Sequence, residues 1–179
     1  MTLGAAPLAA PFFSKGFPMP TLVATKGNKD ANSYATVAEA DTYLDTIYGA
    51  DEWATLDDDD KARLLITATK MIDRLSINTS DYGSYSKTQA LNFPLADADG
   101  NETGFAKAAE AAIIQAFYIY LNHDTISEGT TMAVQGVKSE TIGPTSKTIT
   151  GFNPFRKFDS QVFVLLKDYL DLDFVIPRG

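Results

Sequence analysis

Apolar residues recur at helical spacing in several segments, and this periodicity limits the fold more than any other feature of the sequence. The segments that show it are residues 36–48, 56–75, 104–122 and 160–170. In the first of them, Thr36 and Glu39 have the spacing of a capping box, and Gly49 provides a C-terminal stop. We therefore predict a mainly α protein, a small helical bundle of about four helices.

The segments around these helices have other compositions. Residues 76–103 are rich in Ser, Asn, Asp, Gly and Tyr, which predicts a long loop anchored by Leu91, Phe93 and Pro94. Residues 125–158 alternate in polarity, which favours an extended, β-hairpin-like segment. We expect flexible terminal arms and the following division: N-terminal arm (1–31), helical body (32–124), extended loop or hairpin (125–158), C-terminal helix (159–170) and C-terminal tail (171–179).

The net charge of -8 is spread unevenly along the chain. Residues 33–124 hold six Lys and Arg against sixteen Asp and Glu, residues 1–32 carry +2, and residues 125–179 are balanced at six against six. An acidic body argues against nonspecific DNA binding, because affinity for a polyanion comes mainly from cations that displace its counterions. DNA near this protein is expected to pass it without being bound. No window has the roughly 20 apolar residues that cross a bilayer, so no membrane partner is expected.

The sequence offers no convincing catalytic centre, cofactor site or metal site. There is no cysteine and His123 is the single histidine, which excludes thiolate catalysis and multi-histidine metal sites. The run Asp57–Asp60 could in principle bind a divalent cation. Consecutive helical residues diverge by about 100°, however, so a solvated helix N-terminus is the better interpretation. Residues 97–101 resemble part of a calcium loop but lack its later glycine and glutamate. We expect a protein that is not an enzyme.

Several motifs, in chain order, resemble one family of phage proteins. They are residues 32–44 (NSYATVAEADTYL), Trp53 ahead of the second helix, residues 68–75 (ATKMIDRL), residues 89–94 (QALNFP) and residues 137–144 (VKSETIGP). On these motifs the chain is similar to the head–tail connector, or adaptor, proteins of tailed bacteriophages. Some members of that family are labelled DnaT-like single-stranded DNA-binding proteins. Leu95 departs from the family pattern, which often has Arg after Phe-Pro.

The resemblance implies a virion structural protein in the neck between capsid and tail, present in the host cytoplasm during assembly. Its partners would be copies of itself in a dodecameric ring, the portal protein, and a tail or head-completion protein. Genomic DNA would pass through the lumen without specific binding. Excess apolar surface and flexible arms suit a ring subunit. The candidate interface residues are Val137, Lys138, Ser139, Glu140, Thr141, Ile142 and Gly143 in the extended segment and Phe174, Val175 and Ile176 in the tail.

A single-stranded DNA-binding replication protein, as the DnaT-like label suggests, is the alternative. That function needs a basic groove with aromatic side chains on which bases stack. The available aromatic residues include Tyr82, Tyr85, Phe93, Phe152 and Phe155, but few cations lie near them in the sequence. The sequence alone therefore favours the connector and keeps the DNA-binding protein as the second hypothesis.

Overall fold

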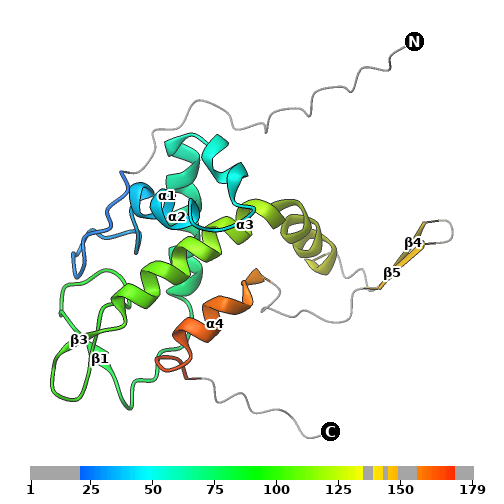
Figure 1. Cartoon of the computed structure of the whole chain (residues 1–179). Coiled ribbons are helices and arrows are strands. Elements are labelled where there is room, and N and C mark those ends of the chain that lie inside the picture. The colour runs from blue at the N-terminus through cyan, green and yellow to red at the C-terminus, as the bar shows by residue number, and fades with distance from the viewer. Residues whose placement is uncertain (1–20, 135–138, 143–144, 149–156, 172–179) are drawn as a thin grey trace, which may run out of the picture.

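The computed structural model describes residues 21–134, 139–142, 145–148 and 157–171, with side chains placed for residues 21–123 and 157–171 (Figure 1). The described helices are α1 (Val37–Leu44), the 3-10 helix η1 (Asp51–Thr55), α2 (Asp58–Ile72), α3 (Phe105–Val134) and α4 (Ser160–Leu166). The described strands are β1 (Gly83–Ser84), β2 (Leu95–Ala96), β3 (Glu102–Thr103), β4 (Ser139–Ile142) and β5 (Thr145–Thr148). The prediction of a mainly α fold with about four helices is confirmed.

The helix starts follow the capping signals in the sequence. Thr36 Oγ1 accepts a hydrogen bond from the Glu39 N–H at 3.2 Å, and Glu39 Oε2 accepts one from the Thr36 N–H at 2.7 Å, which completes the predicted capping box. At the start of α2, Asp57 Oδ1 accepts the Asp60 N–H at 2.8 Å. In both helices the side chain satisfies a backbone donor that has no partner within the helix.

Two helix ends differ from the prediction. Helix α1 ends at Leu44 rather than at residue 48, because the N–H groups of Thr46 and Ile47 donate to carbonyls three residues earlier and turn the chain away. Tyr48 is left wholly exposed. Helix α4 ends at Leu166, four positions before the predicted end at Leu170.

The core lies where α3 packs between α2 and α4 (Figure 1). The face of α3 that its neighbours cover is built largely from alanines with no exposed surface, which are Ala108, Ala111, Ala112 and Ala116. Small side chains let a neighbouring helix approach closely, since the distance between packed helices depends on the residues at the contact. One hydrophobic cluster surrounds Trp53 and Leu65, and a second surrounds Phe93 and Leu166.

Residues 76–103 are more ordered than the predicted loop. They contain the antiparallel sheet β1-β2-β3, in which Ser84 pairs with Leu95 and Leu95 pairs with Thr103. Each strand is two residues long, so no alternating pattern could mark it in the sequence. Phe93 and Pro94 are buried as expected, and Gly104, at φ +82, lies so close to the Phe93 ring that an added Cβ would stand 2.8 Å from it.

The predicted boundaries of the N-terminal arm and of the extended segment are also corrected. Residues 21–31 belong to the body, because Asn32 holds this segment through the Val23 N–H and the Thr21 carbonyl at 2.8 and 2.9 Å, and Leu22 packs on the core. Helix α3 continues to Val134, past the predicted boundary at residue 124. Beyond it, β4 and β5 form the expected hairpin, with Ser139 opposite Thr148. Residues 1–20 and 172–179 lie outside the described residues.

A buried polar network joins the start of the body to the end of α2 and to residues 89–94 (QALNFP), which we call the Phe-Pro motif. The Tyr34 hydroxyl donates to Asp73 Oδ1 at 2.6 Å, and the Asn92 N–H donates to the same oxygen at 2.6 Å. The Phe93 N–H donates to the Tyr34 hydroxyl oxygen at 3.2 Å, beside a cis Phe93–Pro94 peptide bond. Burial, with the negative charge of Asp73, raises the pKa of the Tyr34 hydroxyl, so Tyr34 is a neutral donor at physiological pH.

We expect Tyr34→Phe to lower the free energy of unfolding by about 1–2 kcal/mol, because Asp73 and the Phe93 N–H both lose a partner in a buried place. Urea denaturation followed by circular dichroism measures the change. Tyr43→Phe is the matched control, since the Tyr43 hydroxyl donates to Glu110 at 3.0 Å in a more exposed position. It should cost less than about 1 kcal/mol. Equal losses in the two variants would contradict the importance of the Tyr34 network.

Candidate functional site

The acidic residues of the body gather at one end of it. Nine of the sixteen carboxylates in residues 33–124 lie within residues 39–60, in α1, η1 and the first turn of α2. In Figure 1, η1 and the start of α2 lie at the top of the view, whereas the β1-β2-β3 sheet and the turn at residues 24–30 lie to the lower left. The two ends of the body therefore differ in how many carboxylates they carry, nine within residues 39–60 against Asp81, Asp97, Asp99 and Glu102 around the sheet.

An exposed tyrosine and three lysines lie on two neighbouring segments at the sheet end. We call Lys26, Lys29, Tyr85 and Lys87 the aromatic–basic surface. The Ala90 N–H donates to the Asn28 carbonyl at 3.2 Å, which holds the turn that carries Lys26 and Lys29 beside the loop that carries Tyr85 and Lys87. Tyr85 is 47% exposed, so much of its ring is open to solvent. An aromatic ring with neighbouring cations is what stacking on a base and pairing with a phosphate require.

The loop that carries Tyr85 is fixed by one glutamine of the Phe-Pro motif. Gln89 Oε1 accepts the Ser86 N–H at 2.8 Å. Its Nε2 lies 2.8, 3.0 and 2.9 Å from the carbonyl oxygens of Leu91, Asn92 and Pro94, which share its two hydrogens. Tyr85 therefore precedes a rigid turn rather than a free loop, and less entropy is lost when a ligand stacks on it.

Two of the three lysines pair with carboxylates. Lys26 Nζ contacts Glu102 Oε2 on β3, and this hydrogen bond is the main reason that the pKa of Lys26 is raised, with nearby Tyr85 a smaller cause. Lys29 Nζ lies 2.7 Å from Asp30 Oδ2. Both pairs are solvent-exposed and therefore contribute little stability, so a phosphate can replace the carboxylate at small cost.

The other aromatic residues that the sequence offered do not form platforms. Phe93 is fully buried in the core. Tyr82 packs on Tyr169 with ring centroids 5.2 Å apart, and Lys107 lies over the same Tyr169 ring. Phe152 and Phe155 lie outside the described residues. Among the described candidates, Tyr85 is thus the aromatic side chain that a base could reach.

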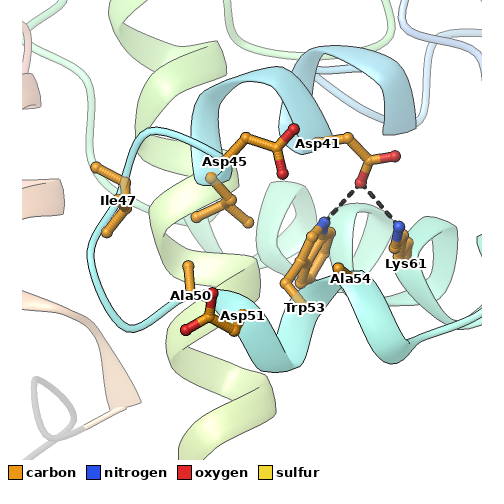
Figure 2. A pocket seen from close by; sticks show the side chains of 9 residues that line it. Asp41, Asp45, Ile47, Ala50, Asp51, Trp53, Ala54 and Lys61 are labelled. Carbon is orange, nitrogen blue, oxygen red and sulfur yellow. Dashed lines mark hydrogen bonds and ion pairs between the residues drawn. The ribbon is translucent and has the colours of Figure 1, made fainter.

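A pocket of about 300 Å³ opens at the acidic end (Figure 2). It is lined by Asp41, Leu44, Asp45, Ile47, Ala50, Asp51, Trp53, Ala54 and Lys61. Asp41 Oδ1 accepts the Trp53 indole N–H at 2.8 Å and the Lys61 ammonium at 2.9 Å, the two dashed lines of Figure 2. Lys61 is itself buried and lies over the Trp53 ring, 5.9 Å from its centroid. The carboxylates around this pocket repel phosphate, so it is no part of a nucleic-acid site.

The remaining residues singled out in the sequence have structural roles. Asp57 caps α2, and burial together with Asp57 raises the pKa of Asp60. Asp97 accepts the N–H groups of Asn101 and Asp99 in a polar turn, and these hydrogen bonds, first that of Asn101, lower its pKa. Among the described residues, no group of three or more His, Cys, Asp or Glu side chains could hold a metal ion. No helix in the described part of the chain could span a membrane.

The candidate interface residues are only partly placed. Ser139, Glu140, Thr141 and Ile142 form β4. Val137, Lys138, Gly143, Phe174, Val175 and Ile176 lie outside the described residues. Their assignment as an interface remains a prediction.

Comparison with known proteins identifies the family. Residues 19–170, most of the chain, match a family model described as "Putative DnaT-like ssDNA binding protein". The chain belongs to this family. No curated protein and no solved structure matches the chain significantly.

The family match corrects the interpretation of the resemblance. The prediction of a head–tail connector is wrong, and with it the predictions of a dodecameric ring, of portal and tail partners, and of DNA that passes without being bound. The alternative, a DNA-binding protein, agrees better with the family. The reason lies in what the shared motifs do. Thr36 and Glu39 cap a helix, Tyr34 and Asn92 build the buried network, and Gln89 fixes a loop. Motifs of this kind specify a fold, and a fold does not by itself specify a function.

Proposed function

We propose that the protein binds single-stranded DNA through the aromatic–basic surface. Membership of the DnaT-like ssDNA-binding family is the observation that carries the proposal. The exposed Tyr85 ring, with lysines on both the neighbouring turn and its own loop, supplies the place on this chain. We propose a binding function alone, with no catalysed reaction.

The chemistry of the surface defines how the strand would bind. A base stacks on Tyr85, and the flanking phosphates pair with Lys26 and Lys87. Stacking accepts any base, because every base has a π-face, so sequence preference should be weak. Nine of the sixteen carboxylates of residues 33–124 lie at the far end of the body, but Asp81, Asp97, Asp99 and Glu102 lie around the sheet itself and oppose binding. Binding remains possible despite the net charge of -8, but it should be modest in affinity.

We expect Tyr85→Ala to weaken binding to a fluorescein-labelled oligothymidylate about fivefold or more, because stacking contributes about 1–3 kcal/mol per base. Fluorescence anisotropy at low salt measures the dissociation constant. Tyr48→Ala is the matched control, since Tyr48 is also exposed but lies at the acidic end. It should leave the affinity unchanged.

The salt dependence of the same titration is a second test of the proposal. Two or three phosphate contacts predict that the logarithm of the affinity falls against the logarithm of salt concentration with a slope of about -1.4 to -2.1. The proposed surface would be refuted if the wild-type protein showed no saturable, salt-sensitive binding. Equal losses of affinity in Tyr85→Ala and Tyr48→Ala would also refute it.

Removing the carboxylate that pairs with Lys26 should strengthen binding. We expect Glu102→Gln to raise the affinity for oligothymidylate by up to about fivefold, because an exposed ion pair is worth about 0.2–1 kcal/mol and the freed ammonium can meet a phosphate. Glu52→Gln removes one exposed carboxylate at the acidic end and should have a smaller effect. The gain should vanish in the double variant Lys26→Ala, Glu102→Gln. A gain that persists without Lys26 would mean that only the net charge matters.

A further inference from the structure

The pocket at the acidic end has apolar walls and a charged rim. Leu44, Ala50 and Trp53 are buried and form its inner surface. Ile47 lines it while remaining 42% exposed. Tyr48, the next residue, is wholly exposed, so apolar surface continues from the pocket to the outside of the body. Apolar surface of this kind, beside charged groups, is typical of a place where another molecule docks.

The carboxylates of the pocket are not equivalent. Asp41 already pairs through its Oδ1 with Trp53 and Lys61. Asp45 and Asp51, at the end of α1 and the start of η1, are exposed, and within the described residues neither side chain forms a hydrogen bond or an ion pair (Figure 2). Asp45 is the C-cap of α1, and the carbonyl groups at a helix C-terminus add negative potential at this point.

We propose that this pocket binds an arginine side chain presented by a basic segment of a partner protein. Charge complementarity selects a cation, and the apolar walls select one with an aliphatic stem, which rules out a small inorganic ion. The planar guanidinium can meet carboxylates bidentately and pack its faces on apolar side chains, which an ammonium does less well. The pocket volume of about 300 Å³ admits one such side chain. Nucleic acid is excluded here by the same carboxylates that attract the cation.

This inference stands independently of the proposed DNA binding. The aromatic–basic surface and the pocket lie at different ends of the body, so both can be occupied at once. The protein would then hold a DNA strand at one end and a basic protein segment at the other. Failure of either function would leave the other untouched.

The single tryptophan of the chain is a built-in probe of the pocket. The probe ligand is a short synthetic peptide with one arginine between two leucines, compared with a peptide in which citrulline, of the same shape without charge, replaces arginine. Titration of the full chain with the arginine peptide should change the Trp53 emission in a saturable way. The citrulline peptide should bind about tenfold more weakly. Saturating oligothymidylate should leave both affinities unchanged.

Two variants of equal charge separate the pocket from the overall acidity. Asp45→Asn with Asp51→Asn should weaken the arginine peptide about tenfold, because two exposed ion pairs are lost. Asp58→Asn with Asp59→Asn removes two exposed carboxylates outside the pocket and should have little effect. Ala54→Leu, an exposed lining position, should also weaken the peptide by filling the pocket. Equal losses in the two double variants, equal binding of the two peptides, or no saturable signal would overturn the proposal.

Discussion

The carboxylate of Asp73 joins three parts of the chain that lie far apart in the sequence. At the C-cap of α2, it accepts hydrogen bonds from the Tyr34 hydroxyl and from the Asn92 N–H. The side-chain amide of Asn92 donates a second hydrogen bond, to the Asp73 backbone carbonyl at 2.7 Å, so α2 and the Phe-Pro motif are held together twice. Polar groups in such a place are costly when unpaired, and the network therefore has one arrangement in which all its members are satisfied. The start of the body and the long loop both take their position from it.

The position of the candidate DNA surface follows from this network. Asn92 ties the Phe-Pro motif to Asp73, and Gln89 in the same motif fixes the turn that follows Tyr85. The Ala90 N–H then binds the turn that carries Lys26. Each step is a hydrogen bond between backbone and a nearby group, so the series of contacts that leads from Asp73 to Tyr85 is short and stiff. An exposed aromatic ring that is held in this way can act as a stacking platform, whereas a ring on a free loop would lose entropy on binding.

The sequence could predict the helices because their signals are local. The capping box of Thr36 and Glu39 and the apolar periodicity of α2 and α3 depend on residues within one turn of each other. The two-residue strands and the packing of Leu22 depend on distant partners, and no local pattern records them. The shared motifs indicated a family but led to the wrong function. They act on the fold, whereas the residues proposed to meet DNA, Tyr85 and Lys87, lie outside them.

Net charge misled the functional interpretation for a related reason. The sum over residues 33–124 is strongly negative, yet it averages the most acidic end with the sheet end, where Lys26 lies near Tyr85 and Lys87 shares its loop. A ligand near a protein responds to the charges within about one Debye length, roughly 8–10 Å, and much less to those on the far side of the body. Lys26 and Lys29 come from a segment that the sequence assigned to a detached arm, so their proximity to Tyr85 was invisible before the Asn28–Ala90 hydrogen bond placed them. The acidity of the chain is thus greatest at the end that carries the Trp53 pocket. At the sheet end the lysines lie among fewer carboxylates, which limit the affinity for DNA without excluding a local contact; they are Asp30, Asp81, Asp97, Asp99 and Glu102.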